Sequence, residues 1–360
     1  MISDPASSRK TMYPVISRFI FVLLCLSFTM AQADVLILKN GDRITGEVIN
    51  ETDGVLKFKT SYAGILSINW SDVSEIKSAE PMILLLEGDD VLTGKVVKNI
   101  GEMIQVGNED PSSVTELTKE SVNEINPESW LLGNGYKLSG LVNVSLEFDR
   151  GNNVNDDIDL DGRLEYRRLF HRATLFGQYE EKTTDDITTK LKWQADVSYD
   201  FFPKNEWSYV FDAQDWYVGL GLNLKKDEFA DLNLRTRFGP HVGYQFYESK
   251  PLNLFVQGGI EAVEEDYADG VISKYWATTW RFKFDKYIYK ERLQFYFISN
   301  GLFGFATPDK VILEDWVGFR IPLKAGFIAS IETELDYDSQ PAEGTEKLST
   351  TYRFKLGYKF

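Results

Sequence analysis

The amino-acid sequence predicts an all-β protein: a transmembrane antiparallel up-and-down β-barrel of about 12 strands, preceded by two small β repeats. Three observations support this prediction. Apolar and polar residues alternate from residue 136 to the end, in runs longer than the usual strand of about five or six residues. The chain starts with a stretch typical of an export signal, and it ends in Phe360 after a series of alternating aromatic residues.

Residues 1–33 have the features of a secretory signal peptide. Basic residues precede an apolar run at 19–30, and the tripeptide at 31–33 matches the small-residue cleavage pattern. The run is too short to span a bilayer comfortably, although an uncleaved N-terminal anchor is the alternative. We therefore expect an exported chain whose mature part begins at Asp34.

Two stretches, 34–79 and 80–128, resemble each other. Each begins with an apolar run, turns at a glycine (Gly41 or Gly88) and continues as a second strand, which predicts a hairpin. Several short strands in so few residues form a pattern that resembles a small SH3-like or Sm-like barrel fold. We expect two modules separated near Pro81, with a linker at 129–135. Sm proteins bind RNA, but that function does not fit an exported acidic chain, so only the fold is taken from this resemblance.

Charge and composition exclude several classes of function. The net charge of -16 argues against a nucleic-acid partner, because phosphate binding needs a clustered cationic surface. Two His and one Cys make a Cys/His metal site or a disulfide framework unsuited to this chain, and we expect no cofactor. The series Asp157, Asp159 and Asp161 resembles the start of a calcium loop, but Arg168 stands where that loop needs a glutamate.

From residue 136 onward, successive side chains alternate between an apolar and a charged face. Long strands of this kind are typical of a membrane barrel, in which closure satisfies every backbone polar group. A bulge is expected at Pro240, which lacks an N–H. The expected strands are 136–149, 155–168, 170–183, 186–202, 214–228, 231–247, 252–266, 272–288, 291–305, 311–322, 325–338 and 347–360.

The C-terminal strand ends in alternating apolar residues, mostly aromatic, which resemble the signal read by the outer-membrane barrel assembly machinery. The alternative is simply a last amphipathic strand. With the signal peptide, this indicates the outer membrane of a Gram-negative bacterium, with the N-terminal repeats in the periplasm. The residues of this expected assembly signal are Tyr352, Phe354, Leu356, Tyr358 and Phe360.

Three segments, Leu160–Glu180, Asp227–Phe246 and Leu335–Phe360, resemble the YdiY-like family of salt-induced outer-membrane proteins. The resemblance covers roughly 136–360, and residues 204–213 look like an insertion. It implies a barrel fold and an outer-membrane location, in a family without an established activity. We expect a role in envelope maintenance or in salt and osmotic response.

The charged faces of the strands would line the barrel lumen. Glu332 and Glu334 can pair with Arg353 if the last two strands are neighbours. The lumen is then either filled by its own ion pairs or a narrow porin-like channel selective for ions or small solutes, and the strand number does not decide between them. The expected lumen charges are Arg163, Arg167, Arg235, Arg237, Arg281, Arg320, Arg353, Glu147, Glu165, Asp196, Glu261, Glu332 and Glu334.

The sequence gives little indication of a catalytic site. A lipid hydrolase would need a Ser–His pair facing the lipid, but His241 lies on the polar face, His171 falls in an expected turn, and no G-x-S-x-G motif occurs. We therefore expect no enzyme activity, with a membrane lipid hydrolase as the remaining alternative. The expected partners are outer-membrane lipids, the assembly machinery and a periplasmic protein or peptidoglycan.

Overall fold

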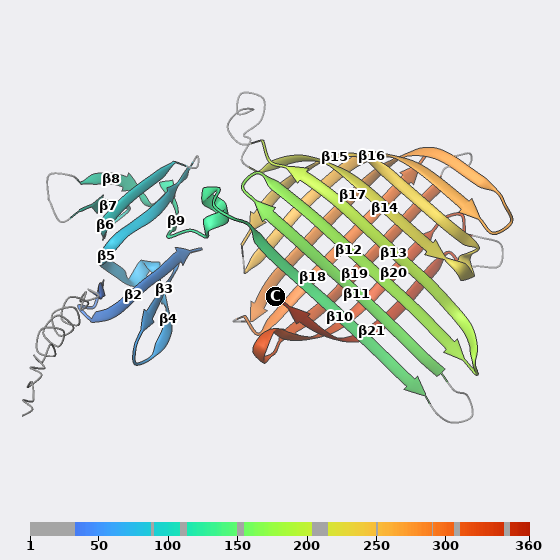
Figure 1. Ribbon diagram of the computed structural model, residues 1–360, viewed down its shortest axis with the longest axis horizontal. Helices are drawn as coiled ribbons and strands as arrows, with labels where there is room; N and C mark the ends of the chain where they lie inside the picture. Colours follow the sequence, from blue (N-terminus) through green and yellow to red (C-terminus); the bar gives the residue numbers. More distant parts are fainter. Residues whose placement is uncertain are drawn as a thin grey trace, which may run out of the picture. The chain divides into compact units, whose positions relative to one another are not determined.

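The computed structural model shows two compact units, residues 1–127 and 128–360 (Figure 1). It describes residues 33–87, 90–108, 114–149, 155–203, 215–249, 251–289, 291–305, 310–341 and 346–360. The expected signal peptide, up to residue 32, and the expected insertion at 204–213 lie outside the described residues. Among the residues that are described, no helix is both long enough and apolar enough to cross a membrane.

The first unit is a nine-stranded antiparallel sheet in its described part. Its strands follow the order β4-β3-β2-β1-β5-β6-β7-β8, and β9 pairs with both β2 and β5. The strands are β1 (Asp34–Leu38), β2 (Arg43–Thr52), β3 (Val55–Thr60), β4 (Gly64–Asn69), β5 (Val73–Leu86), β6 (Val91–Ile100), β7 (Met103–Gly107), β8 (Thr115–Thr118) and β9 (Val122–Ile125). Short 3-10 turns, η1 (Trp70–Asp72) and η3 (Lys119–Ser121), precede β5 and β9.

The expected separation into two modules at Pro81 is not what the structure shows. β5 runs through residues 79–81 without a break and pairs with strands from both halves. Its register against β6 shifts between Lys77 and Met82, and this irregularity accommodates the missing N–H of Pro81. Buried residues from both halves, such as Phe58 and Ile104, form one hydrophobic cluster. The two halves therefore share one strand and one core.

The second unit is a closed antiparallel barrel of strands β10–β21 within the described residues (Figure 1). Its strand bounds agree with the predicted ranges to within two residues, because the period-two pattern persists along the whole segment. The strands are β10 (Lys137–Asp149), β11 (Asn155–Arg168), β12 (His171–Thr184), β13 (Ile187–Phe201), β14 (Trp216–Asp227), β15 (Leu232–Glu248), β16 (Leu252–Tyr267), β17 (Ile272–Tyr289), β18 (Leu293–Gly304), β19 (Lys310–Pro322), β20 (Phe327–Asp338) and β21 (Leu348–Lys359).

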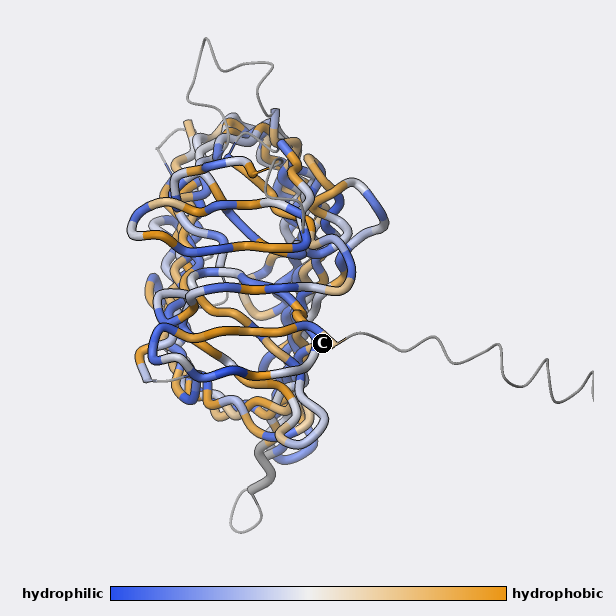
Figure 2. The backbone as a smooth tube through the Cα atoms, turned by 90° about the vertical axis from the view of Figure 1, so that its left-hand side faces the viewer, coloured by the Kyte–Doolittle hydropathy of each residue, from blue (hydrophilic) through white to orange (hydrophobic). Residues whose placement is uncertain are grey.

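Alternation along each strand divides the barrel into two faces. Apolar side chains such as Val197, Leu220 and Phe238 are exposed on the outside, whereas polar side chains such as Asp196 and Arg235 are buried inside. Figure 2 shows the resulting succession of hydrophobic and hydrophilic residues along the strands. An apolar exterior around a polar interior is the reverse of a soluble protein and is the pattern of a barrel surrounded by lipid.

No bulge occurs at Pro240. Leu220 remains opposite Pro240, and the ladder with β16 keeps the same register on both sides of it while omitting Gly239 and Pro240. The missing N–H is thus accommodated by skipped bridges. The register shifts of β15 against β16 lie nearer its ends, between Leu232 and Leu234 and between Gln245 and Tyr247.

The barrel closes where β10 meets β21. Their ladder extends only from Leu141, opposite Lys359, to Val144, opposite Leu356. Gly140 adds two hydrogen bonds at the end of this seam, donating to the carbonyl of Phe360 at 2.9 Å and accepting from its N–H at 3.0 Å. We call the end with Lys137 and Lys359 the terminal end, and the opposite end the loop end.

Residues 129–135, expected as a linker, belong to the barrel unit. They begin with the 3-10 turn η4 (Ser129–Leu132), whose Trp130 carbonyl accepts a hydrogen bond from the N–H of Leu169 at 3.3 Å. The Arg167 guanidinium lies over the Trp130 ring, 5.5 Å from its centroid. These contacts fix the entry of the chain into β10.

Candidate functional site

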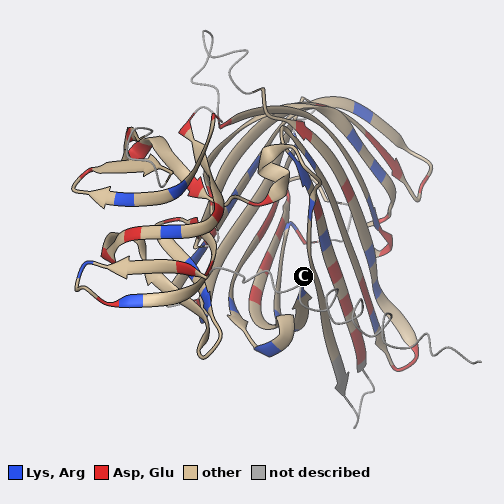
Figure 3. Cartoon of the chain, turned by 60° about the vertical axis from the view of Figure 1, so that its left-hand side comes forward, with Lys and Arg blue, Asp and Glu red and all other residues tan. Residues whose placement is uncertain are grey.

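The candidate site is the barrel lumen, which contains buried Lys, Arg, Asp and Glu side chains. Figure 3 shows how residues of both charge signs are distributed along the strands. Arg353 on β21 pairs with three carboxylates. Its guanidinium contacts Asp159 on β11, Glu180 on β12 at 2.7 Å, and Glu334 on β20. One arginine thereby joins strands on both sides of the barrel seam. Such a fork of charge-assisted bonds is specific to the planar guanidinium.

Lys192 on β13 extends this group across the lumen. Its Nζ lies 3.1 Å from Glu334 and 2.7 Å from Asp336, both on β20. Along the closed order β13-β12-β11-β10-β21-β20, these strands lie on nearly opposite walls. The side chains of Lys192 and Glu334 are almost completely buried, so water screens their attraction little.

Two more groups of ion pairs cross the loop half of the lumen. Lys225 on β14 binds Glu314 on β19. Nearer the loop end, Glu265 on β16 binds Arg235 at 2.6 Å and Lys310 at 3.1 Å. Together with Arg353 and Lys192, these pairs form what we call the lumen network, whose members are Asp159, Glu180, Lys192, Lys225, Arg235, Glu265, Lys310, Glu314, Glu334, Asp336 and Arg353.

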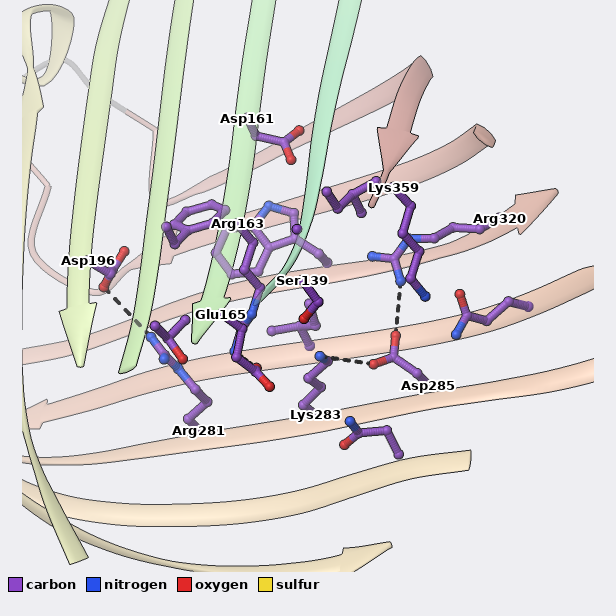
Figure 4. Close-up of a pocket in the computed structure, with 18 of the residues that line it drawn as sticks. Ser139, Asp161, Arg163, Glu165, Asp196, Arg281, Lys283, Asp285, Arg320 and Lys359 are labelled. Carbon is purple, nitrogen blue, oxygen red and sulfur yellow. Dashed lines mark hydrogen bonds and ion pairs between the residues drawn. The ribbon is translucent and has the colours of Figure 1, made fainter. Parts of the chain in front are cut away.

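The terminal half of the lumen contains a cavity of about 300 Å³. Arg163, Glu165, Lys283, Asp285 and Arg320 point toward it from β11, β17 and β19 (Figure 4). Asp285 accepts from Arg320 at 3.0 Å and lies 3.2 Å from Lys283. These pairs are looser and more exposed than those of Arg353.

The structure distributes the predicted lumen charges over both halves. Glu332 bonds Lys355 and the Tyr296 hydroxyl, each at 2.7 Å. Further placements are Arg167 beside Glu248, Arg237 3.6 Å from Glu261, Arg281 3.7 Å from Asp196, and Arg163 3.8 Å from Glu165. The side chain of Glu147 lies outside the described residues.

Several central members of the lumen network are absent from the predicted set, notably Lys192, Glu180 and Lys225. Each lies at one of the alternate strand positions that carry polar side chains, and this alternation alone predicts that its side chain faces the lumen. What the sequence does not give is the partner, because Lys192 and Asp336 are 144 positions apart. Glu332 and Arg353 are cross-strand neighbours as anticipated, yet Arg353 reaches diagonally to Glu334 and Lys355 to Glu332.

Neither histidine has a serine partner within the described chain. The Nε2 of His241 lies 2.7 Å from Asp200 inside the lumen. His171 is the first residue of β12 rather than part of the turn, and its Nδ1 lies 2.7 Å from the Tyr199 hydroxyl. In the described residues, no three or more His, Cys, Asp or Glu side chains are arranged to hold a metal. Asp159, of the calcium-like series, is instead paired with Arg353.

The C-terminal aromatic residues lie on the outer face. Tyr352 and Phe354 are 77% and 75% exposed, and Leu356, Tyr358 and Phe360 are exposed as well. The inward residues of the same strand, Arg353 and Lys355, are buried in the lumen. One strand therefore presents an apolar surface outside and two cations inside.

A family model described as "Protein of unknown function, DUF481" matches residues 142–360, more than half of the chain. The chain belongs to the DUF481 family. The matched segment covers the barrel from within β10 to the last residue and excludes the first unit. No curated protein matches this DUF481 chain.

Solved structures similar to this DUF481 chain have low identity. The NanC porin is 14% identical with a TM-score of 0.38, covering 62% of this chain and 99% of that one. The translocator domain of the autotransporter NalP from Neisseria meningitidis is 10% identical, with a TM-score of 0.34 and coverages of 63% and 88%. The outer membrane channel DcaP of Acinetobacter baumannii is 11% identical, with a TM-score of 0.31 and coverages of 78% and 94%.

The chemistry available to the DUF481 barrel is electrostatic. Its loop half is spanned by buried ion pairs, which join opposite walls. Its terminal half holds a cavity lined by less completely paired charges. The first arrangement joins opposite walls of the lumen, and the second offers charged groups to a small polar molecule.

Proposed function

We propose that this DUF481 protein is an outer-membrane barrel with a lumen closed by the lumen network, serving envelope maintenance or the response to salt and osmotic stress. The observation that carries the proposal is the pair of contacts from Lys192 to Glu334 and Asp336, which cross from one wall to the other. Breaking a buried ion pair costs about 3–5 kcal/mol, so a network of them resists opening.

The outer-membrane location is supported by the barrel's exposed apolar exterior and by the predicted signal peptide. The proposed orientation puts the N-terminal unit in the periplasm. The proposed partners are outer-membrane lipids, the barrel assembly machinery acting on the C-terminal strand, and a periplasmic protein or peptidoglycan that contacts the first unit. Nucleic acid is not a partner in this proposal, because the chain is strongly acidic.

Bilayer recordings and fractionation test the proposal. Purified full-length protein in planar bilayers is expected to give no stepwise current at any applied voltage. The folded protein is expected in the outer-membrane fraction, where heating shifts its gel mobility. A deletion strain is expected to grow normally at low salt and poorly at high salt. Steady single-channel steps, or an unchanged growth defect at both salt concentrations, would contradict it.

A narrow pore for ions or small solutes is the second candidate, and the cavity in the terminal half favours it. The same recordings separate the two, because a pore requires stepwise current.

We also propose that the barrel is not an enzyme. The Asp200 contact of His241 and the Tyr199 contact of His171 support this, since neither contact is the Ser–His pair that a lipid hydrolase of this kind would need. Phospholipid hydrolysis in detergent that disappears in His241→Ala would overturn it.

A further inference from the structure

The cavity in the terminal half of the lumen combines charge with an apolar wall. Phe176, Phe255 and Trp316 line it together with the charged side chains. Its volume of about 300 Å³ corresponds to the smaller ligand pockets of proteins. Lys359, an exposed residue at the terminal end, is also part of its lining, so the cavity extends to that end of the barrel.

The cavity has a surplus of positive charge on one side. On the other side, Lys355 is held by two carboxylates, Asp161 and Glu332, each at 2.7 Å. By contrast, the single carboxylate of Asp285 is shared by two cations, Lys283 and Arg320. The surplus therefore lies where β17 and β19 face β11, beside Arg163 (Figure 4).

Arg163 is the least completely paired of the cavity's arginines. Its one ion-pair contact among described residues is with Glu165, at 3.8 Å between Nη2 and Oε2, beyond hydrogen-bonding distance. Arg281 donates to Asn300 at 2.9 Å, and Arg320 lies over the Tyr296 ring besides its bond to Asp285. The guanidinium of Arg163 thus has donors available to a molecule in the cavity.

We propose that this cavity binds a small organic carboxylate. The guanidinium of Arg163 accommodates the carboxylate in its bidentate fork, and Lys283 adds a second positive charge. Phe176 and Trp316 contact the carbon chain of the ligand. This goes beyond the proposed function and does not depend on it, because binding from the terminal end requires no passage through the lumen network.

Calorimetric titration of the full-length protein in detergent micelles tests the site with molecules of one chain length. The probes are succinate, 1,4-butanediol and 1,4-diaminobutane, with inorganic phosphate as an anion that has no carbon chain. Succinate is expected to bind saturably and more tightly than phosphate, and the diol and the diamine are expected to give no saturable heat. Preference for the diamine, equal binding of phosphate, or no saturable succinate binding would overturn the proposal.

Variants connect the binding to Arg163. Arg163→Gln is expected to weaken succinate binding by about tenfold or more, through loss of the charge-assisted bonds. Arg237→Gln is the matched control, because Arg237 is also a lumen arginine with a loose partner, 3.6 Å from Glu261, and does not line this cavity. Heat-modifiable gel mobility verifies that both variants fold. Equal affinity in folded Arg163→Gln and wild type would refute the assignment.

Discussion

The Nζ atom of Lys192 on β13 lies 2.7 Å from the Oδ2 of Asp336 on β20, although 144 positions separate the two residues in the chain. Both residues occupy polar positions on strands at opposite walls of the barrel. The contact therefore ties together two walls that no backbone ladder connects. Variants of the lumen network can therefore test whether these ion pairs block passage through the lumen.

Removing cations from this network is expected to open the lumen. In Lys192→Ala combined with Lys225→Ala, the carboxylates of Glu334, Asp336 and Glu314 lose their cross-lumen partners and repel one another. We expect stepwise cation-selective current in planar bilayers, where wild type gives none. Lys274→Ala is the control, since Lys274 is 67% exposed and outside the network. A double variant as silent as wild type contradicts the role assigned to these lysines.

Arg353 is expected to be the most costly lumen charge to remove. Arg353→Gln leaves Asp159, Glu180 and Glu334 close together and without their shared cation. The unfolding free energy should fall by about 3–5 kcal/mol, the usual cost of breaking a buried pair. Arg353→Lys should recover only part of the loss, because an ammonium lacks the fork geometry. Denaturant unfolding followed by gel mobility measures the unfolding free energy of each variant. Equal stability of Arg353→Gln and Arg237→Gln would refute the special cost assigned to Arg353.

The first unit should lose stability as the pH rises. Burial raises the pKa of the Glu51 carboxyl to about 7, against an ordinary value of 4.5, and the nearby Glu124 and Asp53 act in the same direction. Its contribution is therefore complete below the ordinary pKa and is lost as the pH rises through 7, by about 3 kcal/mol in all.

Hydrogen exchange of β2 and β9 in the full-length protein measures this effect, because Glu51 lies opposite Ile125 of β9. Protection should fall between about pH 5 and pH 8 in wild type, after correction for intrinsic exchange. Glu51→Gln should remove the dependence, whereas Glu47→Gln, at an exposed position, should keep it. The same pH profile in Glu51→Gln would show that another group is responsible.

Gly140 is expected to favour barrel closure. A Cβ at this position would lie 2.4 Å from the Phe360 ring, which packs over the glycine at the seam. Gly140→Ala should therefore reduce the fraction of heat-modifiable, folded protein. Gly258→Ala is the matched control, because a Cβ there meets its nearest atom at 3.9 Å.

Combining Gly140→Ala with Phe360→Ala separates the steric effect from the loss of the C-terminal side chain. If the ring is the obstacle, the double variant should fold better than the sum of the single effects predicts. Phe360→Ala alone should still lower the amount in the outer membrane if the assembly machinery reads this residue. Strict additivity would show that Gly140 acts through something other than the ring.

The barrel strands could be predicted because a period of two residues is local information, visible within each strand. Their bounds and the lumen position of Arg163 or Glu334 follow from that alternation. The contact between Lys192 and Asp336 could not be predicted from this alternation, because it depends on how the closed sheet places distant strands. The single sheet of the first unit could not be predicted, because a proline such as Pro81 usually marks the end of a strand, whereas β5 accommodates it by a register shift.

The last strand has a consequence for assembly that follows from its two faces. Before β21 joins the barrel, Asp159 and Asp161 on β11, Glu180 on β12 and the two glutamates of β20 lack the positive charges of Arg353 and Lys355. These carboxylates therefore lack part of their counter-charge until β21 fills the gap between β10 and β20. The final strand brings these counter-charges with it, so electrostatic attraction favours its insertion in the correct register, whereas a strand shifted by two residues would place only one of the two cations among the same carboxylates.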